Sequence, residues 1–292
     1  MSRLPAVFTL LASLVFAGCA ARTIQFPADP GSPLPDFSRV HADLARACTG
    51  VSTLTAELAL SGRAGGRHLR GRVLAGFERP DSMRLEGVAP FGAPGFVVAS
   101  RGAAATMLLP RDNRVLRGAS ADQILGGLTG VSLAPGDLLA ILTGCVMPLP
   151  AAEAGRLHAN GWASLHLKGD ATLYLQRSAS GWQSRAARRP GWQIEYAEWS
   201  GGFPRRVRML SMLRGGAGSG GHDGTDVDLI AQISQLETNR AIAAAAFTVD
   251  VPETALPMTI EDLRASGPLR GAAVFTAPGP LPAEVTEVRF SE

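Results

Sequence analysis

The residues of this chain best suited to covalent chemistry are its three cysteines, Cys19, Cys48 and Cys145. Cys19 ends an apolar N-terminal segment, whereas Cys48 and Cys145 lie further along the chain. This even pair is a candidate disulfide in an oxidising compartment. The alternative is two buried free thiols, because an unoxidised cysteine packs as a small hydrophobic side chain. The residues alone leave both alternatives open.

Motifs for catalysis, metal binding and nucleotide binding are absent from the sequence. It has no G-x-S-x-G and no H-E-x-x-H, and its five histidines are scattered without zinc-like spacing. A formal G-x-G-x-x-G lies in the stretch 214–224, but neither an apolar helix nor a P-loop lysine follows it, and we interpret it as a hairpin loop or a disordered excursion. We therefore predict a non-enzyme without metal or cofactor; a Ser–His pair in a cleft would favour an enzyme instead.

The N-terminus predicts export and lipidation. Arg3 precedes an apolar run, residues 4–16, which has the length of a signal-peptide core and is too short to span a bilayer. Val15-Phe16-Ala17-Gly18-Cys19 resembles a bacterial lipobox, so residues 1–18 are a predicted signal peptide and Cys19 the lipidated residue. An ordinary signal peptide cut at a nearby alanine is the alternative. Ala20 follows where aspartate would favour inner-membrane retention, and the resemblance therefore implies the outer membrane.

Composition indicates a globular protein that does not bind nucleic acid. Removing 18 residues from 292 leaves 274, and 46% of the chain is hydrophobic, enough for a substantial core. The 28 basic and 25 acidic residues give a net charge of +3, too balanced for a nucleic-acid surface. Six arginines gather between residues 185 and 208, either as a solvated strand face or as a surface for lipid phosphates.

The hydrophobic pattern predicts an α+β fold. Residues 20–35 are rich in proline, so 19–35 is a predicted lipidated tether, and helical spacing follows over 36–50. Alternating apolar residues then predict strands, interrupted by two short, charge-poor helices that begin near Ser120 and Pro135. Together they indicate a strongly curved antiparallel sheet, an unclosed β-barrel, with a helical lid over residues 36–240.

One loop of the predicted sheet carries an unexpected aromatic residue. Gly87 to Phe96 contains two prolines and three glycines, which work against a regular strand. Phe91 stands between Pro90 and Gly92, where a large apolar ring faces water unless something covers it. The ring either folds back as an anchor for the turn or projects as an apolar tip.

Several short motifs, taken in order, resemble LolB, the outer-membrane receptor of the lipoprotein localisation pathway. They are Met83-Arg-Leu-Glu, Ala89-Pro-Phe-Gly92, the segment Ala121 to Gly130 ending in Leu-Thr-Gly, the segment Leu133 to Leu139 with its helix-opening proline, and Leu142-Thr-Gly144. The resemblance is clearest over residues 53–145 and continues loosely to 239. It implies the LolA/LolB-like half-barrel with a helical lid, the architecture that the hydrophobic pattern also indicates.

The resemblance implies a function without catalysis. The protein would bind the acyl chains of lipoproteins, received from a LolA-type periplasmic carrier, and help insert them in the outer membrane as a lipid-anchored monomer facing the periplasm. The family's protruding-loop leucine falls on Phe91, which becomes the predicted membrane-insertion residue. The predicted acyl-cavity lining is Leu58, Leu60, Val73, Phe77, Ile124, Leu125, Leu128, Leu138, Ile141 and Leu142. Ordinary core packing is the alternative for each, and a non-catalytic lipid-binding or envelope-assembly scaffold is the alternative function.

The chain departs from the family after Asn239. Residues 241–292 form a predicted C-terminal extension that LolB proteins lack, partly flexible because its tail from Gly267 is rich in proline, alanine and glycine. Within it, Thr259 followed by Glu261 and Asp262 predicts the start of a short helix.

Overall fold

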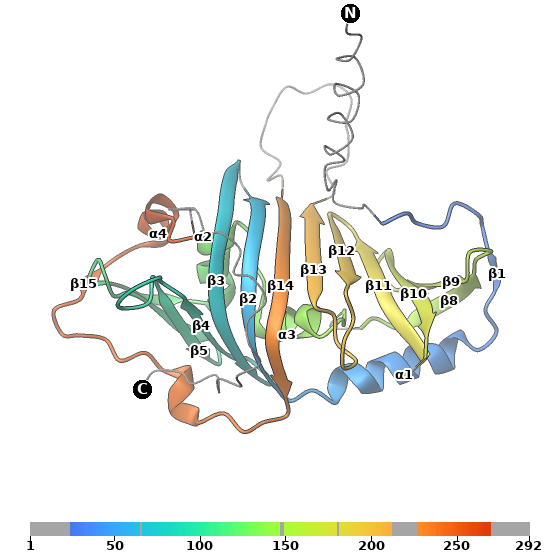
Figure 1. Cartoon of the computed structure of the whole chain (residues 1–292), viewed down its shortest axis with the longest axis horizontal. Coiled ribbons are helices and arrows are strands. Elements are labelled where there is room, and N and C mark those ends of the chain that lie inside the picture. The colour runs from blue at the N-terminus through green and yellow to red at the C-terminus, as the bar shows by residue number, and fades with distance from the viewer. Residues whose placement is uncertain (1–23, 65, 147–148, 180, 212–226, 270–292) are drawn as a thin grey trace, which may run out of the picture.

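The computed structural model describes residues 24–64, 66–146, 149–179, 181–211 and 227–269 (Figure 1). The predicted signal peptide, Cys19 and the glycine-rich stretch 214–224 lie outside the described residues, as does the end of the predicted C-terminal extension.

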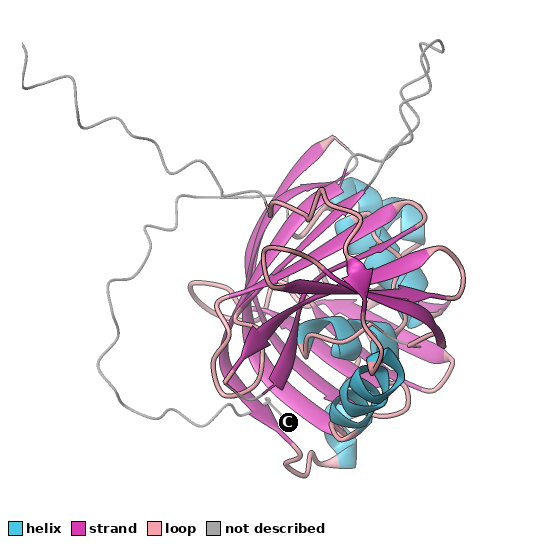
Figure 2. Ribbon diagram, turned by 90° about the vertical axis from the view of Figure 1, so that its right-hand side faces the viewer, coloured by secondary structure: helices cyan, strands magenta, loops and turns pink. Residues whose placement is uncertain are grey.

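The described chain forms one large sheet of 15 strands, antiparallel except for one parallel pair at its end. The sheet curves around the helices without closing into a barrel (Figure 2), which confirms the predicted fold class. In spatial order from one edge to the other, the strands are β1 (Ser32–Pro33), β8 (Ala152–Leu157), β9 (Trp162–Leu167), β10 (Ala171–Ser178), β11 (Gly181–Arg189), β12 (Trp192–Ala197), β13 (Arg206–Ser211), β14 (Val227–Thr238), β2 (Thr53–Ala64), β3 (Arg67–Glu78), β4 (Ser82–Gly87), β5 (Val97–Arg101), β6 (Ala104–Leu109), β7 (Arg114–Ala119) and β15 (Leu256–Pro257).

Within the described ranges, four α-helices and one 3₁₀ helix, η2 (Ala244–Phe247), accompany the sheet: α1 (Phe37–Thr49), α2 (Ala121–Thr129), α3 (Pro135–Leu142) and α4 (Ile260–Ser266). Their ends follow from local chemistry. Gln123 accepts a hydrogen bond from the backbone N–H of Ser120 at 3.0 Å, and Gly130 ends α2 with a φ of 77°. Pro135 opens α3 because its fixed φ suits the first helical turn.

Two hydrophobic cores lie side by side on this sheet. The larger lies between the central strands and α2, α3 and α4. The smaller lies between α1 and strands β9 to β11, where it includes Leu165, Leu167, Leu173 and Leu175. A disulfide joins Cys48, at the end of α1, to Cys145, after α3, with a Cα–Cα distance of 5.8 Å. The disulfide therefore joins α1, which covers the smaller core, to the end of α3, which covers the larger core.

The segment predicted as a tether is docked where it is described. The sequence predicts no regular structure for residues 20–35, yet β1 pairs with β8 and Leu34 is buried. The ring of Phe26 packs edge-on against Tyr174 at 4.8 Å, and the guanidinium of Arg188 lies 3.5 Å from the Phe26 ring centroid. Residues 24–35 therefore pack on the domain, through strand pairing, the buried Leu34 and the ring contacts of Phe26.

Candidate apolar cavity and protruding loop

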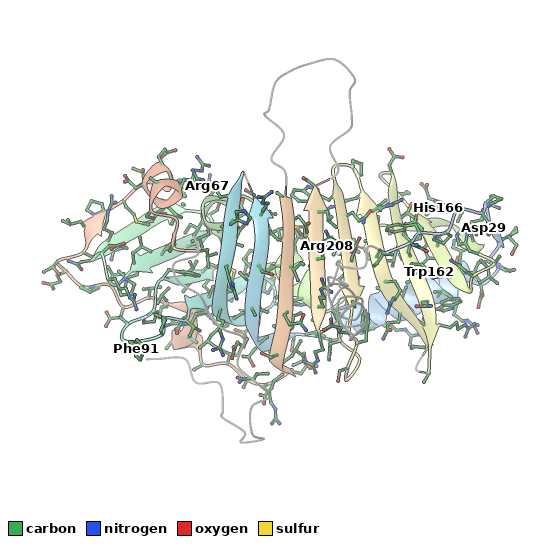
Figure 3. All side chains as sticks on the ribbon, turned by 45° about the horizontal axis from the view of Figure 1, so that its top comes forward. Asp29, Arg67, Phe91, Trp162, His166 and Arg208 are labelled. Atoms are coloured by element: carbon green, nitrogen blue, oxygen red, sulfur yellow. A yellow bond between two sulfur atoms is a disulfide. The ribbon has the colours of Figure 1, made fainter. Side chains whose placement is uncertain are left out.

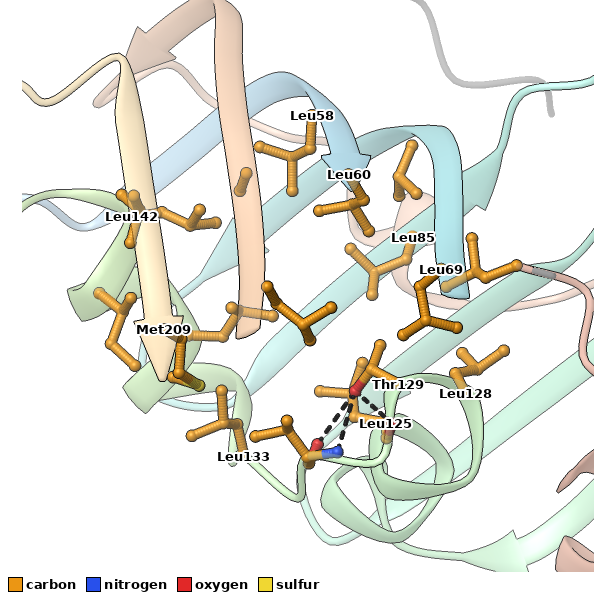
Figure 4. Close-up of a pocket in the computed structure, with 18 of the residues that line it drawn as sticks. Leu58, Leu60, Leu69, Leu85, Leu125, Leu128, Thr129, Leu133, Leu142 and Met209 are labelled. Atoms are coloured by element: carbon orange, nitrogen blue, oxygen red, sulfur yellow. Dashed lines mark hydrogen bonds between the residues drawn. The ribbon is translucent and has the colours of Figure 1, made fainter. Parts of the chain in front are cut away.

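A cavity of about 120 Å³ lies between the central strands and helices α2 and α3 (Figure 4). The side chains around it are hydrocarbon or thioether with one exception, Thr129. Its lining residues are Leu58, Leu60, Leu69, Val73, Leu85, Phe96, Leu125, Leu128, Thr129, Val131, Leu133, Leu138, Ile141, Leu142, Val207, Met209, Leu229, Ile230, Ala231 and Leu269.

The single hydroxyl of the lining is already engaged. Thr129 Oγ1 donates to the carbonyl oxygen of Leu125 at 2.8 Å and accepts from the N–H of Val131 at 3.2 Å (Figure 4). A polar ligand group placed here would lose its hydrogen bonds to water and find little in return. The cavity is therefore suited to hydrocarbon.

Most of the residues predicted to form an acyl cavity surround this one. Eight of the ten appear in its lining: Leu58, Leu60, Val73, Leu125, Leu128, Leu138, Ile141 and Leu142. Phe77 and Ile124 do not, and this part of the prediction is corrected. Phe77 is 1% exposed and pairs with Met83 near the far end of β3. Ile124 lies about 100° around α2 from Leu125, so it packs in the solid core beside the cavity.

Sequence reasoning missed lining residues from several other places, among them Leu85 on β4 and Phe96 before β5. Strands β13 and β14 contribute Val207, Met209, Leu229 and Ala231, and the link between α2 and α3 contributes Val131 and Leu133. Alternation predicts strands over 206–212 and 226–233, but it does not say which face of each strand meets the cavity. Leu269, from the C-terminal extension, carries no sequence signal for such a role.

The loop between β4 and β5 separates its two phenylalanines. Phe91 is 87% exposed and lies at the edge of the molecule (Figure 3), whereas Phe96 is 2% exposed and lines the cavity. A Cβ atom at Gly87 would lie 2.5 Å from the Phe96 ring, so only glycine admits this ring at the base of the loop. Phe96 thus anchors the turn, and Phe91 is the projecting tip.

The backbone of the Phe91 loop is held by hydrogen bonds from an arginine side chain in a neighbouring turn and by one within the loop. Arg111, between β6 and β7, donates from Nη2 to the carbonyl oxygen of Phe91 at 2.7 Å and from Nε to that of Ala93 at 3.4 Å. The N–H of Gly95 donates to the carbonyl oxygen of Gly87 at 2.9 Å. These contacts fix the loop backbone while leaving the ring of Phe91 in solvent.

Two of the six arginines between residues 185 and 208 have their guanidinium groups engaged within the protein. Arg208 donates from Nε and Nη2 to the two carboxylate oxygens of Asp228, each at 2.7 Å, and the pair holds the pKa of Asp228 below its usual value. Arg188 donates to Gln193 at 2.8 Å and stacks over Phe26. The interpretation as part of a strand face therefore fits these two residues better.

A serine, a histidine and an aspartate meet at the opposite end of the sheet. His158 Nε2 lies 3.0 Å from Ser164 Oγ, and its Nδ1 lies 3.5 Å from Asp29 Oδ1 and 3.1 Å from the backbone oxygen of Asp29. Ser164 is only 2% exposed and lines neither the apolar cavity nor the polar pocket beside Arg63. A buried hydroxyl that lines neither of these pockets fits a structural link that fastens Asp29 to the turn between β8 and β9.

Among the described residues, no cluster of three or more His, Cys, Asp or Glu side chains is arranged to hold a metal ion. In the same part of the chain, no helix has both the length and the hydrophobicity to cross a membrane.

No protein-family model matches this chain, and no curated protein sequence matches it. Among solved structures, a LolA superfamily protein from Nitrosomonas europaea is similar at 13% identity and a TM-score of 0.43, covering 73% of this chain and 97% of its own. A putative outer membrane lipoprotein-sorting protein domain from Vibrio parahaemolyticus is 14% identical with a TM-score of 0.37, over 73% and 96% of the two chains. The lipoprotein LppX from Mycobacterium tuberculosis is 12% identical with a TM-score of 0.29, over 72% and 99%. Likeness this distant assigns no activity to the chain.

Proposed function

We propose that this chain is a lipoprotein of the outer membrane that holds acyl chains of other lipoproteins in its apolar cavity and helps insert them in that membrane. The observation that carries the proposal is the cavity: its lining is apolar except for Thr129, and that hydroxyl is engaged within the lining. A pocket with this chemistry selects hydrocarbon and offers nothing to position a reacting group. The function proposed for this chain is therefore that of a carrier or receptor and not that of an enzyme.

The energetics of acyl chains explain why such a cavity is useful. Each CH₂ transferred into water costs about 0.8 kcal/mol, so exposing the several chains of a lipoprotein costs on the order of tens of kcal/mol. Delivery through water therefore requires passage from one apolar cavity to another. The proposed partners are acylated lipoproteins and a LolA-type periplasmic carrier that hands them over to a single copy of this chain.

Phe91 is the proposed membrane-insertion residue. Its ring is 87% exposed, and moving it from water into acyl chains would gain about 1.5–3 kcal/mol. Phe96 roots the same loop in the cavity lining, so the tip that would touch the membrane and the site that would hold cargo are only five residues apart in sequence. Lipidation at Cys19, which lies outside the described residues, would keep this loop near the outer membrane from the periplasmic side.

Transfer of cargo tests the proposal. A full-length chain with Cys19→Ala, which cannot be lipidated, is mixed with an acylated lipoprotein held by a LolA-type carrier, and the two proteins are separated after incubation. We expect the lipoprotein to move to this chain. A folded chain that takes up no lipoprotein would contradict the receptor function.

A second function is favoured by the small size of the cavity. About 120 Å³ is less than the roughly 300 Å³ at which ligand pockets for drug-sized molecules begin. A non-catalytic lipid-binding or envelope-assembly scaffold needs no room for several acyl chains. Binding of a free fatty acid, measured separately, by a chain that takes up no lipoprotein in the transfer assay would favour this scaffold.

A further inference from the structure

The C-terminal segment 256–269 crosses the half of the molecule that contains the apolar cavity, from the edge strand β15 to the cavity wall. It begins as β15 beside β7, where the N–H of Met258 donates to the carbonyl oxygen of Val115 at 2.8 Å. It continues as α4, which packs on α2 (Figure 1). Gly267, with a φ of 49°, ends α4 and turns the chain, so that Leu269 reaches β3.

The middle of this segment is firmly attached to α2. Leu263 is 0% exposed, and a Cβ atom at Gly127 would lie 3.0 Å from its Cδ2 atom, so the glycine permits close packing of the two helices. Asp262 also forms an ion pair with Arg114 at 2.9 Å. We therefore expect α4 to stay in place when ligands come and go.

The end of the segment is attached differently. Strand β3 extends beyond its neighbour β4, because their register ends at Val73 opposite Gly87. Along the part of β3 that β4 does not cover, the N–H of Arg70 donates to the carbonyl oxygen of Leu269 at 3.0 Å. Strands β2 and β3, by comparison, pair along their whole lengths. Residues 267–269 are thus attached to β3 over a shorter length than β2 is.

The side chain of Leu269 occupies space beside the cavity. It is 4% exposed, belongs to the lining, and would lie 3.0 Å from a Cβ atom at Gly71. The remaining 120 Å³ is close to the volume of about 150 Å³ that binds a benzene ring in an engineered apolar cavity. A long acyl chain needs more room, so part of the wall must move before one can enter.

We infer that residues 267–269 are a displaceable plug, and that an acyl chain enters the cavity by taking the place of the Leu269 side chain. This inference rests on the proposed function, in which the cavity holds acyl chains. Apolar contacts are kept in this exchange, because the acyl chain packs against the same leucines that the Leu269 side chain contacted. Since the open state must form first, the apparent affinity for a ligand is the affinity of the open state multiplied by the fraction of molecules that are open.

Fatty-acid binding tests this inference. The probe is a dansyl-labelled fatty acid, whose emission rises in apolar surroundings, added to the full-length Cys19→Ala chain. Leu269→Ala removes most of the plug side chain. We expect this variant to bind the probe about tenfold more tightly, because the alanine competes less with the fatty acid for the same space. The matched control is Leu256→Ala in the same segment, at a leucine that is 63% exposed and does not line the cavity.

The outcomes separate the plug from the proposed function. Tighter binding by Leu269→Ala, with Leu256→Ala equal to the parent chain, supports the plug. Equal affinity in all three chains overturns the plug but leaves the apolar site standing. If none of the three binds the probe, the proposed function fails and the plug falls with it.

Hydrogen exchange provides a second test that needs no substitution in the segment. The Arg70 amide donates to Leu269, so displacing the plug should speed its exchange when the fatty acid is added. The Asn239 amide, which donates to the carbonyl oxygen of Thr53 at 3.0 Å, is the reference and should not change. Unchanged or slower exchange at Arg70 in a chain that binds the probe would overturn the plug, even if Leu269→Ala does not fold.

Discussion

The two halves of this sheet are covered by helices in different ways. On the β8–β11 half, α1 lies so close to the strands that a Cβ atom at Gly155 would come within 2.4 Å of Phe37 Cβ. Small residues, among them Ala163, Ala171 and Ala187, make room in that core. On the other half, α2 and α3 leave a cavity over strands that carry Leu58, Leu60 and Leu69.

Leucines lie in both interiors, so hydrophobicity alone does not decide whether a covered sheet is solid or hollow, and the close approach of the covering helix that Gly155 permits is the difference. A glycine on the strand lets a helix approach until the interior is close-packed, whereas α2 and α3 leave free volume over the leucines of β2 and β3. One sheet can therefore combine a rigid half, which supports the fold, with a half that has room for hydrocarbon.

Breaking the disulfide should have the largest effect, because it ties the covering helices of the two halves together. Its partners are 97 residues apart, and losing a cross-link over a loop of that length costs about 4.7 kcal/mol in the chain-entropy model. We expect the Cys48→Ser, Cys145→Ser double variant to lose about that much free energy of unfolding in urea. A chain whose unfolding midpoint is unaffected by the double substitution would contradict the tie.

Substitutions that enlarge a side chain should destabilise the solid half more than the half with the cavity. Gly155→Leu in the solid half should lose about 3 kcal/mol of free energy of unfolding, because overpacking a full core costs about 1–3 kcal/mol and the contact with Phe37 is already closed. Leu60→Phe, on the wall of the cavity, is the matched change and should lose less than about 1 kcal/mol. Urea unfolding of both variants measures the contrast, and equal losses would mean that the cavity is not real free space.

An exposed apolar residue should matter for function on one half and not on the other. Phe91→Glu should leave the unfolding midpoint unchanged but reduce release of bound lipoprotein into vesicles about tenfold or more, since a carboxylate at the tip opposes entry into acyl chains. Leu157→Glu is the control, at a leucine on the solid half that is 40% exposed. If Phe91→Glu unfolds readily, the ring is an anchor and not a tip.

The smallest effect concerns the carboxylate at the start of α3. Burial raises the pKa of Asp137 above its usual value, and the charge of Arg189 only partly opposes this. The folded state therefore binds a proton more readily than the unfolded state, which lowers stability at neutral pH and restores it as the pH falls below the unfolded pKa. Asp137→Asn should raise the free energy of unfolding at pH 7 by less than about 1 kcal/mol, because water screens a partly exposed carboxylate. In urea titrations at several pH values, the gain should vanish under acidic conditions, and a gain that persists there would exclude this cause.

The sequence predicts the fold more completely than the site. Alternating residues such as Leu58, Leu60 and Val73 indicate a hairpin with one buried face, and Pro135 marks the start of a helix, because both signals are local. The cavity depends instead on how far α2 stands from the sheet, so Leu125 and Ile124 look alike in sequence although only Leu125 lines it.

Contacts between distant segments were the hardest to predict. Phe26 lies in a proline-rich stretch without periodicity, and its partner Tyr174 is far along the chain. Leu269 likewise follows a glycine and a proline, which indicate only the end of a helix. Chain topology brings these residues to their partners, and a single sequence carries little information about such contacts.

The two edge strands have a consequence for aggregation. An unclosed sheet presents unpaired N–H and C=O groups at each edge, which can recruit strands from other molecules. Here both edges, β1 and β15, are two residues long and end in a proline, Pro33 and Pro257. A proline offers no N–H to an incoming strand, and a two-residue edge gives it almost no length to pair with. The sheet can thus stay unclosed while its two edge strands give an incoming strand little to pair with.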